Sequence, residues 1–263
     1  MKDYCNERWR ETLAHNGLVD FQAIWQFEAD WFEPPNRRRG GWSGVSRCEL
    51  THPDGTPRVI FLKRQENHGT PTFWHPFRGE PTYAREFRRI MNYRQAAIPA
   101  LEPVYFAMRR VGGDDRAILI TEELSGYSSL EKQVCRWWQD GAPPRAERLR
   151  VLLAVAALMR DMHARGLQHS CFYPKHIFTR READGNISVR VIDLEKSRWR
   201  PFKILCALRD LYALHCLSPY WSRSDRLRFL KAYLQVSRLT PYGKWLWRKV
   251  AQRAARKRRR IDE

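Results

Sequence analysis

The sequence predicts an α+β protein of two lobes, a small β-rich lobe followed by a larger and mostly helical one. The chain has 263 residues, enough for one large domain or for two lobes around a cleft. Up to about residue 125, short β-forming runs alternate with turns around one helical stretch, and from Ser128 onward the pattern is mainly helical. A composition of 43% hydrophobic and 13% aromatic residues indicates a folded chain despite its high charge.

The small lobe is assigned to residues 31–125, behind an N-terminal helical extension at 1–30. In that extension Phe21, Ile24 and Trp25 have the i, i+3, i+4 spacing of a short helix. Within the lobe, a glycine-bearing turn at 37–44 leads into a strand, and the turn 53–57 precedes the β-forming run 59–63. These two segments predict a hairpin.

The rest of the small lobe alternates a helix with strands. Residues 80–96 have a helical pattern, and prolines at 99 and 103 end it before the β-rich run 104–108. The turn 112–115 then returns the chain into a second run at 117–124. We therefore expect one helix inserted among strands.

The larger lobe is assigned to residues 126–243. A helix at 145–165 is apolar on most sides, which is typical of a buried central helix. The β-forming runs 177–179 and 188–193 flank a polar turn and predict a short hairpin, whereas 203–260 are mostly helical. Residues 244–263 form a separate basic helix or tail.

Charge and cysteine usage restrict the class of protein. The formal net charge of +19 favours an anionic partner: nucleic acid, an acidic membrane face or a polyphosphorylated substrate. None of the six cysteines forms a C-x-x-C pair, so we expect reduced thiols in the cytoplasm. The longest strongly apolar stretch, Val151 to Met159, is nine residues, and a helix needs about 20 to cross a bilayer. We therefore expect no membrane-spanning helix.

Two segments of the larger lobe indicate phosphoryl transfer. Asp193 follows a β-rich run and lies near Glu195, a carboxylate pair suited to Mg²⁺, and His176 is a candidate second ligand. His169 begins a loop with the spacing of a kinase catalytic loop, in which Cys171 falls on the position of the catalytic aspartate. A helix-capping role for Asp193 and a structural role for His176 are the alternatives.

The small lobe supplies candidates for holding a nucleotide. Lys63 ends an apolar strand, and Glu86, 23 residues later on the predicted helix, could pair with it. Gly41 and Gly44 match the second and third glycines of G-x-G-x-x-G, although Arg39 stands at the first, so a purely structural turn is the alternative. In the run 118–124, Glu122 and Leu124 lie where backbone groups would bind adenine.

Taken together, the order of these motifs resembles the InaA/WaaP lipopolysaccharide kinase family over roughly residues 35–235. The most specific match is the run 173–178 paired with 192–195. The resemblance implies a protein-kinase-like bilobal fold with ATP and Mg²⁺ as cofactors. It also implies phosphorylation of a lipopolysaccharide inner-core sugar, typically a heptose, at the cytoplasmic face of a Gram-negative inner membrane.

One departure from that family bears on catalysis. The standard members have His-Arg-Asp where this chain has His169-Ser170-Cys171, and neither serine nor cysteine supplies a carboxylate. One hypothesis gives acceptor orientation to Glu195 or His169, so that the catalytic candidates are His169, Asp193 and Glu195. The competing hypothesis is a pseudokinase that serves as a nucleotide-binding scaffold or sensor in envelope biogenesis.

The basic C-terminal stretch predicts a peripheral membrane contact. Aromatic and basic side chains alternate there in a pattern typical of contact with anionic lipid, and the candidates are Trp245, Trp247, Arg256, Lys257 and Arg258. A solvated tail and an RNA-binding arm are the alternatives. A nucleic-acid-binding module would explain the charge but not the ordered site candidates, and because no nucleic-acid motif occurs we do not favour it.

Overall fold

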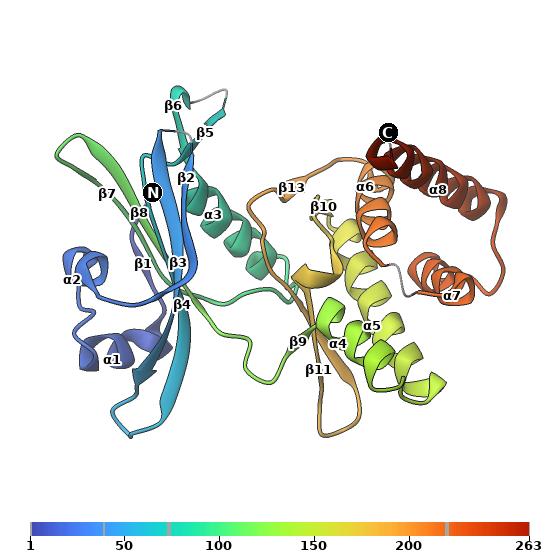
Figure 1. Ribbon diagram of the computed structural model, residues 1–263, viewed down its shortest axis with the longest axis horizontal. Helices are drawn as coiled ribbons and strands as arrows, with labels where there is room; N and C mark the ends of the chain where they lie inside the picture. The colour runs from blue at the N-terminus through green and yellow to red at the C-terminus, as the bar shows by residue number, and fades with distance from the viewer. Residues whose placement is uncertain (1, 39, 73–74, 219–220, 263) are drawn as a thin grey trace. The chain divides into compact units, whose positions relative to one another are not determined.

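The computed structural model describes residues 2–38, 40–72, 75–218 and 221–262 of the chain (Figure 1). The chain forms two compact units. The first holds the residues up to Asn92 together with Leu101–Ser125, and the second holds Tyr93–Ala100 together with the chain from Gly126 onward.

The first unit is built on a six-stranded sheet with the strand order β1-β7-β8-β4-β3-β2, and all of its pairs are antiparallel. Helices α1 and α2 cover one face of this sheet and α3 lies on the other (Figure 1). A separate hairpin, β5–β6, precedes α3. The elements are β1 (Tyr4–Cys5), α1 (Glu7–His15), α2 (Phe21–Gln26), β2 (Trp31–Arg38), β3 (Gly41–Thr51), β4 (Pro57–Glu66), β5 (Gly69–Thr72), β6 (His75–Pro81), α3 (Thr82–Gln95), β7 (Pro103–Val111) and β8 (Asp114–Glu122).

Alternation along the strands sends different side chains to the two faces. On β4, Ile60 and Leu62 are fully buried in the core that the sheet shares with α1 and α2. On the opposite face Phe87 of α3 stacks on Phe106 of β7 with the ring centroids 4.3 Å apart. Lys63 directly follows Leu62 on β4, so its side chain points to the opposite face of the sheet, on the side of α3.

The second unit is organised around α5, which is buried on most sides and packs against α7 and β12. Two small antiparallel sheets accompany it, with the orders β12-β11-β9 and β10-β13. The elements are β9 (Ser128–Ser129), α4 (Leu130–Gln139), α5 (Arg145–Ala164), β10 (Leu167–Gln168), the 3₁₀ turn η1 (Pro174–His176), β11 (Ile177–Arg181), β12 (Ile187–Val191), β13 (Arg198–Trp199), α6 (Lys203–Cys216), α7 (Arg223–Leu234) and α8 (Pro241–Asp262).

The predicted α+β fold class is confirmed, with a β-rich first unit and a mainly helical second one. The C-terminal stretch proves to be a packed helix, because Leu246, Val250 and Ala254 repeat every four residues and bury one stripe of α8. None of the described helices combines the length and apolar character that crossing a bilayer requires.

Candidate functional site

A short ion pair joins the strand and the helix of the first unit. Lys63 Nζ lies 2.6 Å from Glu86 Oε1, with the two side chains 15% and 6% exposed. The ammonium also lies 6.0 Å from the centre of the Tyr83 ring. The predicted partnership of Lys63 with Glu86 is thus present in the structure, and it fixes the amine on the α3 face of the sheet.

Gly41 and Gly44 lie on β3, in the hairpin that β3 forms with β2. A Cβ on Gly41 would come within 2.0 Å of Glu66 O, and one on Gly44 within 2.4 Å of the Trp31 ring. Gly41 is therefore required by packing against the Glu66 backbone, and a side chain at position 44 would displace the Trp31 ring. Arg39, at the first glycine position, lies outside the described residues.

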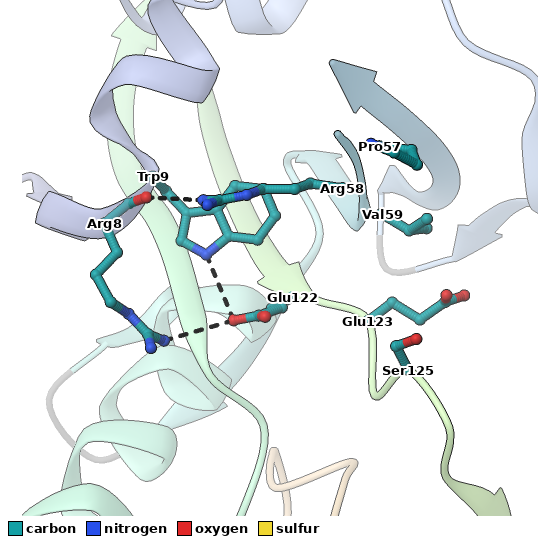
Figure 2. A pocket seen from close by; sticks show the side chains of 8 residues that line it. All are labelled: Arg8, Trp9, Pro57, Arg58, Val59, Glu122, Glu123 and Ser125. Carbon is teal, nitrogen blue, oxygen red and sulfur yellow. Dashed lines mark hydrogen bonds and ion pairs between the residues drawn. The ribbon is translucent and has the colours of Figure 1, made fainter. Parts of the chain in front are cut away.

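Glu122 presents only its backbone to the α3 side of the sheet. It pairs with Ile60, so its side chain points to the α1 face, where Trp9 Nε1 donates to its carboxylate at 3.4 Å and Arg8 lies at 3.7 Å. This carboxylate lines a pocket of about 310 Å³. Figure 2 shows it turned toward Trp9 and Arg8. Glu122 can therefore contribute its main chain, but not its carboxylate, to a nucleotide site on the side of Lys63.

The amides that follow β8 are mostly engaged. Glu122 N donates to Glu102 O, Glu123 N to Val59 O and Ser125 N to Glu123 O. Within the described ranges the amide of Leu124 donates no hydrogen bond to another backbone group. Its N–H is thus available to a ligand, as an adenine-binding segment would require.

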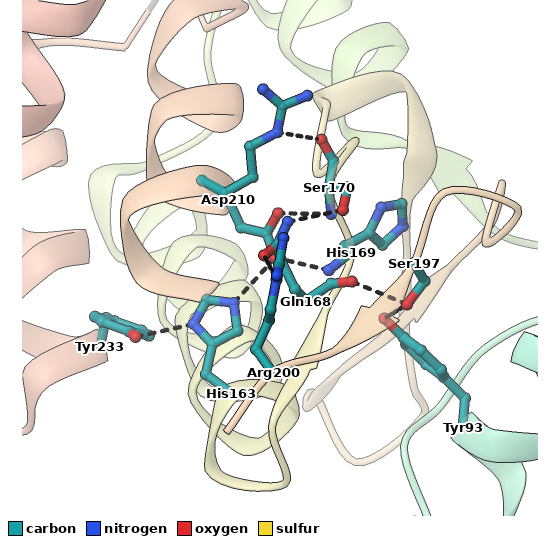
Figure 3. A network of polar contacts seen from close by, with 10 residues as sticks. Tyr93, His163, Gln168, His169, Ser170, Ser197, Arg200, Asp210 and Tyr233 are labelled. Atoms are coloured by element: carbon teal, nitrogen blue, oxygen red, sulfur yellow. Dashed lines mark hydrogen bonds and ion pairs between the residues drawn. The ribbon is translucent and has the colours of Figure 1, made fainter. Parts of the chain in front are cut away.

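In the second unit, the loop after β10 is held by a buried carboxylate (Figure 3). Asp210 of α6 is fully buried, and its two oxygens accept hydrogen bonds of 2.8 Å from the amides of His169 and Ser170. His163 Nε2 lies 3.0 Å from the same carboxylate, and His163 Nδ1 lies 2.9 Å from Tyr233 Oη. Such charge-assisted bonds fix the loop, including Ser170 in the left-handed region at φ 70°.

Sequence reasoning gave Asp210 no role, although it stands in the apolar run of α6. An ionisable residue on the buried face of a helix needs hydrogen-bonding partners. An aspartate among apolar residues of a predicted helix could therefore have indicated a buried polar contact. Arg209, its neighbour, also reaches the loop, where its Nε donates to Ser170 O at 2.9 Å.

His169 lies entirely inside the protein. Its Nε2 is 3.0 Å from Ile192 O, which assigns the proton of the neutral ring to that nitrogen. Burial is the main cause that lowers the pKa of His169, against the opposing effect of Asp210. The ring therefore connects the loop to the segment before Asp193 and is not accessible to an acceptor.

This buried histidine predicts a loss of stability in acid. An unfolded histidine has a pKa near 6.5 and the folded one is lower, so below about pH 6.5 the unfolded state binds more protons. We expect the free energy of unfolding to decrease as the pH is lowered below about 6.5. This group contributes at most about 1.4 kcal/mol per pH unit to that decrease. Urea titrations between pH 7 and pH 5 should show a shallower fall for His169→Gln, and equal slopes would contradict the prediction.

Cys171 is a buried neutral thiol. It is only 4% exposed, and burial raises its pKa despite the attraction of Lys196. Its carbonyl is nevertheless well ordered, with His176 Nδ1 at 3.0 Å and Tyr173 N at 2.7 Å. The loop thus has an organised backbone and lacks a base at this position.

Asp193 and His176 meet beside the loop. His176 Nε2 lies 3.4 Å from Asp193 Oδ2, and Asp193, at φ 59°, keeps a side chain that is 41% exposed. When the ring donates from Nδ1 to Cys171 O, its Nε2 lone pair faces the carboxylate, an arrangement that a shared cation would stabilise. Glu195 is half-buried nearby in the chain. No cluster of three or more potential metal ligands occurs among the described residues.

The predicted membrane-contact residues are spread along α8. Trp245 is 37% exposed and stacks on Tyr242 at 6.0 Å, whereas Trp247 is half-buried against His215 at 5.0 Å. Arg256 is exposed. The side chains of Lys257 and Arg258 lie outside the described part of the structure.

Comparisons with known proteins identify the family of this chain. Residues 22–233 match the lipopolysaccharide kinase (Kdo/WaaP) family. The chain is 34% identical to protein InaA of Escherichia coli K12 over 184 residues, covering 69% of this chain and 80% of InaA. It is 28% identical to the lipopolysaccharide core heptose(I) kinase WaaP of Pseudomonas aeruginosa over 57% of this chain and 59% of that one.

A solved structure shows the same fold. It is titled WaaP in complex with acyl carrier protein, and it superposes with a TM-score of 0.70 at 22% identity over all of both chains. This likeness confirms the kinase-like fold.

Proposed function

Because the chain belongs to the lipopolysaccharide kinase (Kdo/WaaP) family, we propose that it transfers phosphate from ATP to a lipopolysaccharide inner-core sugar, of heptose type. We place this reaction at the cytoplasmic face of the inner membrane of a Gram-negative bacterium. The observation that carries the proposal is the Lys63–Glu86 ion pair of 2.6 Å, found in a chain whose family match spans both units. Phosphoryl transfer depends mainly on such fixed charges, since little covalent chemistry is required of the protein.

In this proposal the first unit binds the nucleotide. Lys63 neutralises phosphate oxygens and Glu86 keeps its amine in place, while the backbone near Leu124 bonds the adenine. The β2–β3 hairpin, in which Gly41 and Gly44 pack against Glu66 and Trp31, would contact the phosphates through its backbone.

The loop of the second unit aligns the acceptor. Asp193 and His176 are the residues that would hold Mg²⁺, and one or two protein ligands suffice when phosphates and waters complete the shell. The bound metal would neutralise charge on the phosphates. Glu195 is the candidate for orienting the acceptor hydroxyl, because its side chain is only half-buried whereas His169 is enclosed.

A nucleotide-binding pseudokinase is the second candidate, and Cys171 favours it. A buried thiol whose pKa is raised cannot take the acceptor proton at neutral pH. On this alternative the chain would bind MgATP and act as a scaffold or sensor without turnover.

Measuring ATP binding and turnover together tests the proposal. We expect MgATP to raise the melting temperature of the native chain, and purified lipopolysaccharide core to become labelled from γ-labelled ATP. Asp193→Ala should lower the transfer rate about 100-fold or more, because charge stabilisation of the transferred group is lost. Asp140→Ala, at the exposed end of α4, should leave the rate unchanged.

The possible outcomes separate the two candidates. Binding of MgATP without transfer would favour the pseudokinase. Equal rates for native chain and Asp193→Ala would contradict the assigned role of that carboxylate.

A further inference from the structure

A run of exposed apolar and basic side chains extends from shortly after Asp193 into the first turn of α6. Trp199, Phe202 and Leu205 are 62%, 65% and 42% exposed, which is unusual for large apolar residues so close together. Exposed cations alternate with them at Lys196, Arg198 and Lys203. We call residues 196–205 the aromatic–basic patch.

The cations of the patch carry uncompensated charge. Lys196, Arg198 and Lys203 make no ion pair within the part of the chain that the structure describes. Unpaired basic side chains beside exposed aromatic rings are typical of a surface that binds an anionic lipid bilayer. The cations contact the charged headgroups and the rings reach the apolar layer beneath.

The patch is held firmly next to the catalytic-like loop. Strand β13 pairs with β10, so that Trp199 lies opposite Leu167, and Arg200 N donates to Gly166 O at 2.7 Å. A Cβ on Gly166, at φ +73°, would come within 2.8 Å of Trp199 Nε1. One edge of the indole therefore rests on the Gly166 backbone while the rest of the ring faces solvent, so the exposed ring needs little further ordering on binding.

The basic end of α8 lies beside the same segment. Trp247 of α8 contacts His215 late in α6, whereas Arg253 lies over Tyr212, 4.5 Å from the ring centre. Later residues of α8 therefore contact earlier residues of α6, and Figure 1 shows the end of α8 near the start of α6. Arg253 and Arg256 add exposed positive charge there.

The aromatic residues at the start of α8 are remote from that basic end. Trp245 and Arg256 stand eleven residues apart on one helix, about 16 Å along its axis. The exposed rings closest along the chain to the first turn of α6 are those of Phe202, which caps the helix, and Trp199.

We propose that the aromatic–basic patch, with the basic end of α8, is the surface by which this chain binds an anionic bilayer. The inference rests on the proposed function, in which the acceptor is part of a membrane lipid. Trp199 and Phe202 enter the headgroup layer while Lys196, Arg198 and Lys203 contact lipid phosphates. Because β13 is hydrogen-bonded to the strand before the loop, this contact brings Asp193 to the membrane surface. A second copy of the chain is a less favourable partner for this patch than an anionic bilayer, since the positive charges of the two patches would repel each other.

Vesicle flotation at low salt tests the proposal. The native full chain should float with phosphatidylcholine vesicles that contain 30% phosphatidylglycerol and not with phosphatidylcholine alone. Phe202→Ser/Leu205→Ser should lower the partition coefficient about tenfold or more, because two exposed apolar side chains that would enter the bilayer are removed. Arg198→Ser/Lys203→Ser should lower it about 25-fold, at about fivefold for each cation.

The matched control is Tyr242→Ser/Trp245→Ser, which removes two exposed aromatic rings from the start of α8. It should bind within about twofold of the native chain. A large loss in this control with unchanged binding of the patch variants would overturn the assignment, and so would equal flotation with neutral vesicles. Phe202→Ser alone replaces the double variant if thermal unfolding shows that the latter is not folded.

Transfer to a soluble acceptor tests the kinase proposal independently of membrane binding by the patch. Both patch variants should keep MgATP-dependent thermal stabilisation and transfer to delipidated core oligosaccharide. A native chain that floats through the patch but transfers no phosphate would contradict the kinase proposal and leave the membrane surface supported.

Discussion

Replacing Cys171 with aspartate is expected to raise the rate of phosphoryl transfer by about 100-fold. The substitution supplies the carboxylate that a general base requires, and a well-placed base contributes about 10²–10⁴ in rate. The native thiol cannot substitute for it, because burial raises the pKa of Cys171 and keeps the sulfur protonated.

The backbone around Cys171 is already arranged for such a residue. Asp210 fixes the two preceding amides at 2.8 Å each, and His176 holds the Cys171 carbonyl at 3.0 Å. Lys196 and Arg209 favour a negative charge at the Cys171 position and Asp193 opposes it, so an introduced carboxylate would be partly compensated. The gain should therefore appear without rebuilding of the loop.

Cys171→Asn is the matched control, since it has the shape of aspartate without the charge. Initial rates of transfer from labelled ATP to lipopolysaccharide core should rise for Cys171→Asp and stay at the native level for Cys171→Asn. An equal response to both would show that polarity or size, and not a base, limits the native enzyme. No transfer by any of the three, with MgATP binding intact, would favour the pseudokinase.

Much of the fold could be predicted because the local helix and turn patterns of the sequence agree with the elements of the folded structure. The predicted helices at 80–96 and 145–165 correspond to α3 and α5, and the turn at 53–57 joins β3 to β4. Strand β2 was not predicted, since Pro34 and Pro35 argue against a strand. The sheet tolerates them because β2 is its edge, where missing amide donors cost little.

The candidate site could be predicted only where spacing along the chain carries information. Lys63 and Glu86 could be paired because a strand and the following helix pack locally, and the distance of 2.6 Å agrees. The role of Asp210 depends on a contact across 40 residues to Ser170, which no local pattern encodes. The exposure of Trp199 could not be predicted either, since aromatic residues are more often buried than exposed.

Asp210→Ala is expected to be the most destabilising substitution in the second unit. The carboxylate is fully buried and accepts from the amides of His169 and Ser170, with His163 at 3.0 Å. Its removal leaves buried donors without an acceptor, and breaking a buried charged network typically costs about 3–5 kcal/mol. For a chain of this size that loss corresponds to a melting temperature lower by about 10 °C.

Asp210→Asn tests whether charge or shape matters more. Its amide group presents donors to an arrangement that already supplies donors, so it should recover only part of the loss. Asp161→Ala on α5 is the control, because that carboxylate is 50% exposed beside Arg160 and its removal should cost less than about 0.5 kcal/mol. Hydrogen exchange gives the local readout: the amides of His169 and Ser170 should be protected in the native chain and in Asp161→Ala, and should exchange rapidly in Asp210→Ala. Continued protection of those two amides in Asp210→Ala would mean that β10–β13 pairing, and not the carboxylate of α6, holds the loop in its left-handed turn.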